Sequence, residues 1–182
     1  MRSAVLISSS FLGLAVPVFA AEPLASTISC GDVNGVPATV VTTKSGKQVP
    51  IIYWQSDVFA ASGWTPTRRC QEVSSRFQEY HQAGSLEFIT TGRMNGLPVI
   101  CVSKSDGGGC VGLLYTLKPG QNATATLQRV LDIQAKPGAA PLQETTARLY
   151  VNFDSMVRSK ARASPSLVQP VASPAPGSGR LF

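Results

Sequence analysis

The sequence predicts an α+β domain in which a mainly antiparallel sheet of about six to seven strands packs against two helices and is held by disulfides. Three observations lead to this class. Short runs rich in Val, Ile and Thr come in groups of three and do not alternate strictly with helices, which favours antiparallel pairing. Two segments carry apolar residues at spacings of three and four, which is typical of helices. Four cysteines follow an N-terminal segment that resembles a secretory signal.

That N-terminal segment, residues 1–20, has the features of a signal peptide. Arg2 precedes an apolar run that ends in Val18-Phe19-Ala20, and we expect cleavage after Ala20. The run is broken by Ser8-Ser9-Ser10 and Pro17, so it is a poor match to a spanning helix, which needs about 20 apolar residues. We therefore predict a single mature domain over residues 21–157 in an extracytoplasmic compartment: the periplasm, a thylakoid lumen or the external medium.

The first half of the domain is predicted to be a three-stranded antiparallel meander followed by a helix. The strands cover residues 27–33, 37–43 and 47–54, separated by turn dipeptides at 34–35 and 45–46. A cap followed by proline, Thr65-Pro66, starts the helix, which runs to Gly84. Its apolar face carries Cys70, Val73, Phe77 and Tyr80.

The second half repeats this order, with three strands, a helix and a final strand. The strands are predicted at 85–91, 97–103 and 110–117, joined by a turn at 92–96 and a glycine loop at 107–109. Asn122 can cap a helix that extends to about Ala135. Apolar residues then alternate over a last strand at 147–153.

The four cysteines are most simply paired in two disulfides, because an even number in an exported chain favours bridges. Four cysteines allow three pairings. We favour Cys101 with Cys110, which face each other across the glycine loop, and this leaves Cys30 to join Cys70. A zinc site or a catalytic thiol is less favoured, since no pair has C-x-x-C spacing and His81 is the only histidine. We predict no metal site and no cofactor.

Three stretches resemble the cyanobacterial circadian oscillating polypeptide family. They are RCQEVSSRFQ at 69–78, TGRMNGLPVIC at 91–101 and CVGLLYTLKP at 110–119. The resemblance extends over residues 26–153, and all four cysteines fit the family pattern. It implies export, association with a membrane as in the family's namesake, and no assigned reaction. No catalytic residue is carried over from it.

The formal net charge of +6 is concentrated outside the predicted domain. Between residues 22 and 157, eleven Lys and Arg stand against ten Asp and Glu, so we expect no nucleic-acid partner. The segment 158–182 contains Arg158, Lys160 and Arg162 followed by many Pro, Ser and Ala residues. We predict that this basic tail is disordered and that it tethers the protein weakly to an anionic membrane surface or to an envelope protein.

One candidate binding surface lies at the start of the first helix. Arg68 and Arg69 occupy the first helical turn beside Trp64, and Arg93 comes from the turn at 92–96. Arginine is unfavourable at a helix N-terminus because of the helix dipole. An anionic ligand, a stacked aromatic ring or an internal carboxylate would each compensate for this cost.

Catalytic patterns are absent from the sequence, and no catalytic residue is assigned. Nucleophile-elbow, P-loop, dinucleotide-binding and zinc-protease motifs do not occur. His81 could act as a general base beside Glu79 or Glu87, but a lone histidine near a helix end is more often a solvated residue. The loop at 106–109 could form a nest for an anion, although Asp and Gly are also common in hairpin loops.

Two functions follow from these observations. The first is an exported, non-enzymatic binding or structural module, peripheral to a membrane or cell envelope, that binds a partner through the arginine and tryptophan residues. The second is a small extracytoplasmic hydrolase that uses paired carboxylates from among Asp57, Glu72 and Glu87. Carboxylates gathered in a concave pocket would favour the enzyme, whereas dispersed charges would favour the binding module.

Overall fold

The computed structural model describes residues 24–132 and 148–163. The predicted signal at 1–20, the end of the predicted second helix beyond residue 132 and the tail from residue 164 onward lie outside the described residues.

The seven strands of the described residues form two antiparallel sheets. The first sheet has the order β1-β2-β3 and the second has the order β6-β5-β4-β7. The strands are β1 (Ala25–Val33), β2 (Val36–Thr43), β3 (Gln48–Tyr53), β4 (Phe88–Met94), β5 (Leu97–Ser103), β6 (Gly112–Thr116) and β7 (Val151–Asn152). The predicted α+β class and strand number are confirmed, with the strands divided between two sheets.

Three α-helices and one short 3-10 helix connect and cover these sheets. They are η1 (Ala60–Ser62), α1 (Pro66–Gln82), α2 (Ala123–Val130) and α3 (Phe153–Ala163). Both predicted caps are present. The Thr65 hydroxyl accepts a hydrogen bond from the Arg68 N–H at 3.2 Å, and the Asn122 side chain accepts one from the Ala125 N–H at 2.9 Å. The second helix ends at Val130, earlier than predicted.

The chain after the second sheet differs from the prediction. β7 is only two residues long, and α3 begins at Phe153, where a strand was expected to end. Phe153, Met156 and Val157 are buried at helical spacing, so burial of this apolar face favours a helix over a continued strand. As a result, Arg158, which we had assigned to a disordered tail, lies on an ordered helix that continues to Ala163.

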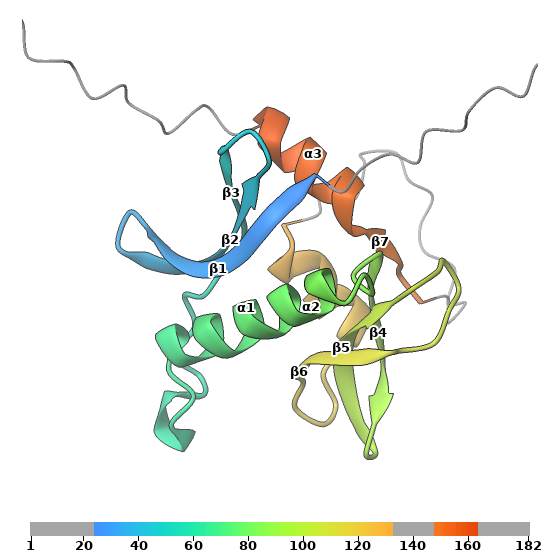
Figure 1. Ribbon diagram of the computed structural model, residues 1–182. Helices are drawn as coiled ribbons and strands as arrows, with labels where there is room; N and C mark the ends of the chain where they lie inside the picture. Colours follow the sequence, from blue (N-terminus) through green and yellow to red (C-terminus); the bar gives the residue numbers. More distant parts are fainter. Residues whose placement is uncertain (1–23, 133–147, 164–182) are drawn as a thin grey trace, which may run out of the picture.

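One hydrophobic core joins the two sheets, with α1 lying between them (Figure 1). Val41 and Ile51 contribute from the first sheet, and Ile89 and Leu114 contribute from the second. Phe77 of α1 is 1% exposed and lies 6.1 Å from the ring of Phe153 of α3. The first helix therefore takes part in the packing of both sheets.

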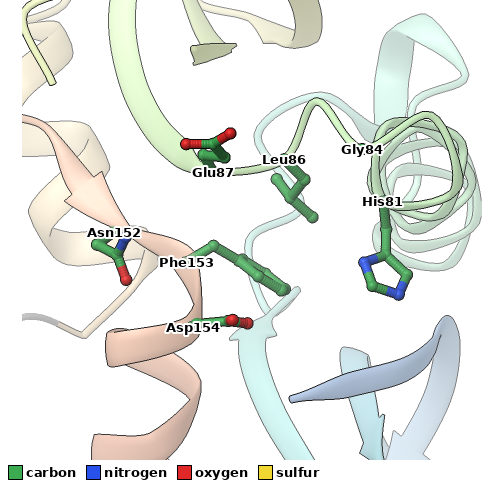
Figure 2. A pocket seen from close by; sticks show the side chains of 7 residues that line it. All are labelled: His81, Gly84, Leu86, Glu87, Asn152, Phe153 and Asp154. Carbon is green, nitrogen blue, oxygen red and sulfur yellow. The ribbon is translucent and has the colours of Figure 1, made fainter. Parts of the chain in front are cut away.

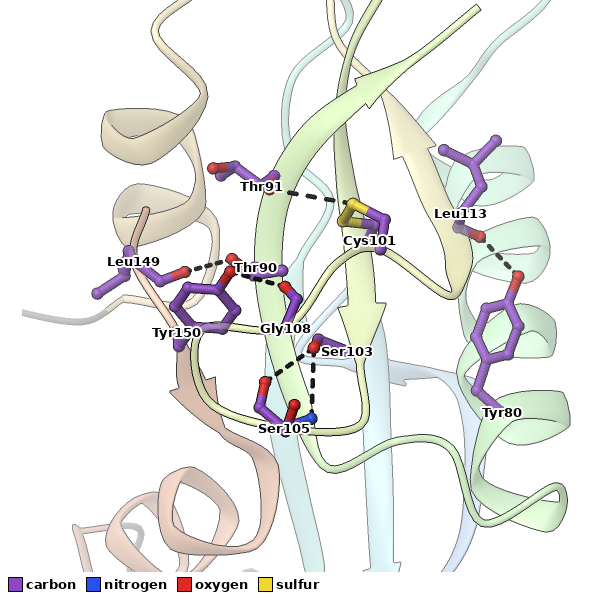
Figure 3. The surroundings of a disulfide bond; sticks show 11 residues. Tyr80, Thr90, Thr91, Cys101, Ser103, Ser105, Gly108, Leu113, Leu149 and Tyr150 are labelled. Carbon is purple, nitrogen blue, oxygen red and sulfur yellow. Dashed lines mark hydrogen bonds between the residues drawn. A yellow bond between two sulfur atoms is a disulfide. The ribbon is translucent and has the colours of Figure 1, made fainter. Parts of the chain in front are cut away.

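The four cysteines form two disulfides, and both predicted pairings are confirmed. Cys30–Cys70 joins β1 to α1, and Cys101–Cys110 joins β5 to the segment before β6 (Figure 3). Gly92 on β4 lies directly beneath the second bridge. A Cβ atom at this position would lie 2.4 Å from the Cys110 sulfur, so a side chain here would displace the disulfide.

Candidate functional site

Trp54 is the first residue of the loop between β3 and α1, residues 54–65, and its ring packs against Tyr115 of β6. Trp54 is 5% exposed, and its Nε1 donates a hydrogen bond to the Thr39 hydroxyl at 3.1 Å. The ring of Tyr115 on β6 meets the Trp54 ring edge to face, with centroids 6.0 Å apart. This pair links the end of the first sheet to an edge strand of the second.

Three cations lie against aromatic rings at this end of the molecule. The Arg69 guanidinium lies 5.4 Å from the Trp54 ring and 5.5 Å from the Phe59 ring. The Lys118 ammonium lies 4.6 Å from the Phe59 ring, and the Arg68 guanidinium lies 4.4 Å from the Trp64 ring. We call these seven residues the cation–aromatic surface: Trp54, Phe59, Trp64, Arg68, Arg69, Tyr115 and Lys118.

The cations of this surface are held by rings and carbonyl groups. Arg69 donates to the carbonyl of Ser56, and Arg68 donates to the carbonyl of Gly63 at 3.3 Å. Within the described residues, none of the three cations forms an ion pair with a carboxylate. Stacked aromatic partners are therefore present for both arginines of the first helical turn, and the surface keeps an excess of positive charge.

Burial perturbs the inner groups of the surface. Burial lowers the pKa of Arg69, while the nearby charges of Asp57 and Tyr115 raise it. Burial also raises the pKa of Tyr115 far above its ordinary value, against a smaller opposing effect of Arg69. Arg69 Nε and the Tyr115 hydroxyl are buried and have no hydrogen-bond partner within the described part of the chain. Tyr115 is therefore a neutral phenol at physiological pH.

The structure brings Trp64, Arg68 and Arg69 together but places Arg93 elsewhere. Arg93 belongs to β4, because the turn is confined to Asn95-Gly96, both with positive φ. Its guanidinium donates to the carbonyl of Gly96 at 2.7 Å within its own hairpin. No interaction of Arg93 within the described residues reaches the cation–aromatic surface.

Sequence analysis did not predict four members of the cation–aromatic surface. Trp54, Phe59, Tyr115 and Lys118 are distant in sequence from one another or from the arginines. Trp54 and Lys118 each lie within two residues of the end of a strand. This position was the signal in the sequence that could have pointed to them, since residues at strand ends often line sites. Which strand ends meet depends on how the two sheets pack.

A separate hollow of about 380 Å³ gathers His81 with two carboxylates, Glu87 and Asp154 (Figure 2). The Phe153 side chain extends between these groups in the same view. No hydrogen bond or ion pair within the described residues joins His81, Glu87 and Asp154 to one another, and Asp154 lies 3.9 Å from Arg158 on its own helix.

The other carboxylates considered for catalysis lie apart from this hollow. Asp57 is in the loop near Arg69, and Glu72 is exposed on α1. In the part of the chain that the structure describes, no three metal-binding side chains are grouped to hold a metal ion.

The outer face of α3 carries two of the basic residues that we assigned to the tail. Arg158 and Arg162 are exposed and line a shallow hollow of about 530 Å³ with Ser155 and Ser159. Lys160 is partly buried, and burial lowers its pKa. Among the described helices, none has the length and apolar character needed to span a membrane.

The glycine loop is occupied by contacts within the chain. The Gly108 N–H donates to the carbonyl of Ser105 at 3.1 Å, and the Tyr150 hydroxyl donates to the carbonyl of Gly108 at 2.7 Å (Figure 3). The hydroxyl of Ser103 also donates to the Ser105 carbonyl. The loop is thus a structured connection, with the Gly108 N–H already used.

The family model described as circadian oscillating protein COP23 matches residues 27–158. No curated protein and no solved structure matches the chain.

Proposed function

Because the chain belongs to the circadian oscillating protein COP23 family, we propose that it is an exported, non-enzymatic binding module that associates peripherally with a membrane or cell envelope. Its two disulfides support export, since such bonds persist in oxidising compartments. They also make the four cysteines structural, which removes a thiol nucleophile from consideration.

The observation that carries this proposal is the cation–aromatic surface. Arg68 and Lys118 are exposed on it, and the Trp64 side chain is 37% exposed. Cations that form no ion pair with a carboxylate of the described residues attract an anionic partner, and the exposed indole adds contact area. We therefore infer that this surface binds an anionic group of a membrane or envelope component.

A second cationic region supports attachment from another side of the molecule. Figure 1 places α3 at one side of α1 and η1 at the far end of α1. Arg158 and Arg162 lie on α3, whereas Arg68 lies in the first turn of α1, so the two cationic regions belong to different helices. Near an anionic bilayer each basic residue contributes about 1 kcal/mol, so two arginines give weak attachment that salt should weaken further.

Cell fractionation tests the attachment. We expect the native protein to sediment with membranes and to be released by a high-salt wash. The Arg158→Gln/Arg162→Gln variant should sediment less. To compare the full chain with one that lacks the tail, the cut is made after Ala163, because this keeps α3 intact. A cut after Val157 would remove part of that helix. Protein that stays bound in concentrated salt, or a double variant that binds equally, would refute the electrostatic tether.

Binding to isolated envelope membranes tests the cation–aromatic surface. The Arg68→Gln/Lys118→Gln variant should bind less than the parent protein, whereas the matched Arg93→Gln variant removes an exposed arginine outside the surface and should bind normally. Pretreating the membranes with protease separates the partners: retained binding assigns a lipid, and lost binding assigns an envelope protein. Equal binding by all three proteins would exclude this surface.

The second candidate function is a small extracytoplasmic hydrolase, favoured by the presence of Glu87 and Asp154 in one hollow with His81. Purified protein can be assayed against chromogenic esters, phosphates and glycosides. Activity that is lost in Glu87→Gln would establish this alternative. Under the binding proposal, no hydrolysis is expected from either protein.

A further inference from the structure

Two buried hydrogen-bond donors at the cation–aromatic surface have no acceptor among the residues that the structure describes. They are Arg69 Nε and the Tyr115 hydroxyl. Both side chains pack against the Trp54 ring, and the two groups are close enough to influence each other electrostatically. Buried polar atoms are nearly always hydrogen-bonded in proteins, so two such exceptions against one ring require an explanation.

Both groups are able to donate to one outside acceptor. Arginine Nε–H can only donate, whereas the neutral phenol hydroxyl can donate or accept, and the two atoms do not bond each other, because each lacks a partner within the described residues. A single acceptor would satisfy both donors, and the positive charge of Arg69 favours an anionic one. Two comparable donors of α1 do have acceptors on β6, the strand that carries Tyr115. The Tyr80 hydroxyl donates to the carbonyl of Leu113, and the Arg76 guanidinium donates to that of Leu114.

We propose that Arg69 Nε and the Tyr115 hydroxyl form the inner subsite for an oxyanion, an oxygen of a carboxylate or phosphate group on the partner. This inference rests on the proposed function, because the exposed Arg68 and Lys118 would attract the same group from outside. The oxygen accepts from both donors at once, and the guanidinium balances its charge.

The cover over the subsite is thin. Arg69 donates to the carbonyl of Ser56, and the half-buried Phe59 ring contacts both Arg69 and Lys118. No residue between 55 and 63 is buried. Segments with few buried contacts open at low free-energy cost, so displacement of Phe59 gives the oxygen access to the donors.

Fluorescence of Trp54 provides a direct test in the purified, disulfide-bonded protein. The chain contains two tryptophans, so Trp64→Phe leaves Trp54 as the reporter, and the Trp54 ring packs against the side chains of both Arg69 and Tyr115. Inorganic phosphate and acetate are titrated separately at constant ionic strength maintained with sodium chloride. We expect a saturable change with one or both anions. Phosphate alone identifies a phosphate group, acetate alone identifies a carboxylate, and both indicate a general oxyanion site.

Tyr115→Phe then removes one donor while keeping the ring. It should weaken anion binding about tenfold, the effect expected for one hydrogen bond to a charged group. Tyr80→Phe is the matched control, because it removes a hydroxyl that already has a partner on the same strand, and it should titrate like the Trp64→Phe parent.

Two results would overturn the subsite. One is a Trp54 signal that responds to neither anion, in which case water occupies the donors. The other is a Tyr115→Phe titration identical to that of its parent. Failure of this test is separable from failure of the proposed function. If the Arg68→Gln/Lys118→Gln variant still loses membrane binding, the outer surface stands without the inner subsite.

Discussion

Helix α1 contacts strand β6 at two places that differ in how their polar groups are satisfied. Near the middle and end of the helix, Arg76 and Tyr80 donate to carbonyl groups of β6 at 2.8 and 3.2 Å. Near its start, Arg69 Nε and the Tyr115 hydroxyl are buried and have no partner in residues 24–132 and 148–163. The polar groups of the first contact have partners within the described residues. Those of the second do not, and we propose that a group from outside supplies the missing partner.

The two contacts between α1 and β6 also differ in how tightly they are packed. At the first, the Tyr80 ring lies on Gly112 so closely that an added Cβ would be 2.3 Å from the ring. At the second, the loop covering Arg69 contains the exposed Val58 and Trp64. The contrast indicates that one end of the α1–β6 interface contributes stability and the other contributes a surface.

Removing the bridge beside the second contact should have the largest effect on stability. Cys70 follows Arg69, and its bridge to Cys30 spans 40 residues. Loss of this bridge in Cys30→Ala/Cys70→Ala should reduce the free energy of unfolding by about 4 kcal/mol, because the unfolded chain gains entropy. Denaturant titration followed by circular dichroism measures this.

The second bridge provides the control. Cys101–Cys110 spans 9 residues, so Cys101→Ala/Cys110→Ala should cost about 3 kcal/mol. A loss below about 1 kcal/mol in the Cys30→Ala/Cys70→Ala variant would mean that the arginine and aromatic contacts hold the start of α1 without the disulfide.

The next largest effect is expected at the complete contact. Gly112→Ala forces the Tyr80 ring away from β6 and should lower the free energy of unfolding by about 1 to 3 kcal/mol through overpacking. Gly109→Ala is the matched control, since nothing lies within 4 Å of its added Cβ. It should stay within about 0.5 kcal/mol of the parent. Equal stability of the two variants would contradict the close packing described here.

Removing one hydroxyl from each contact should change stability in opposite directions. Tyr80→Phe loses a hydrogen bond to Leu113 and should destabilise by about 1 kcal/mol. Tyr115→Phe removes a buried hydroxyl that has no partner among the described residues, and it should be neutral or stabilise by up to about 1 kcal/mol. Chemical denaturation of both variants gives the two signs, and a destabilised Tyr115→Phe protein would show that its hydroxyl has a partner.

The smallest effect is a pH dependence specific to Tyr115. Burial raises the pKa of Tyr115 above the usual value of 10.0, so the unfolded chain ionises first as pH rises. Stability from the neutral hydroxyl is therefore complete below pH 10 and is lost above it. At pH 10.5 this loss should be about 0.8 kcal/mol in the parent. It should be absent in Tyr115→Phe, and parallel stability curves from pH 9 to 10.5 would contradict this prediction.

Local signals in the sequence were enough to predict most of the helices and strands and part of the cation–aromatic surface. Thr65-Pro66 located the start of α1, and the neighbours Trp64, Arg68 and Arg69 lie within one turn of it. Residues this close in sequence must also be close in space, which is why this part of the surface was predictable. The prediction failed at Phe153, where alternation suggested a strand but the spacing of buried residues continued as a helix.

The sequence by itself determined the α+β class and the capped helices, because each depends on periodicity or on short-range spacing. It favoured one of three cysteine pairings, and the structure confirmed that pairing. Only the tertiary structure decided that Trp54, Tyr115 and Lys118 join Arg69, and that Arg93 does not. Those contacts depend on how two separate sheets pack around α1. That packing is set by the summed burial of many side chains, and no single segment encodes it.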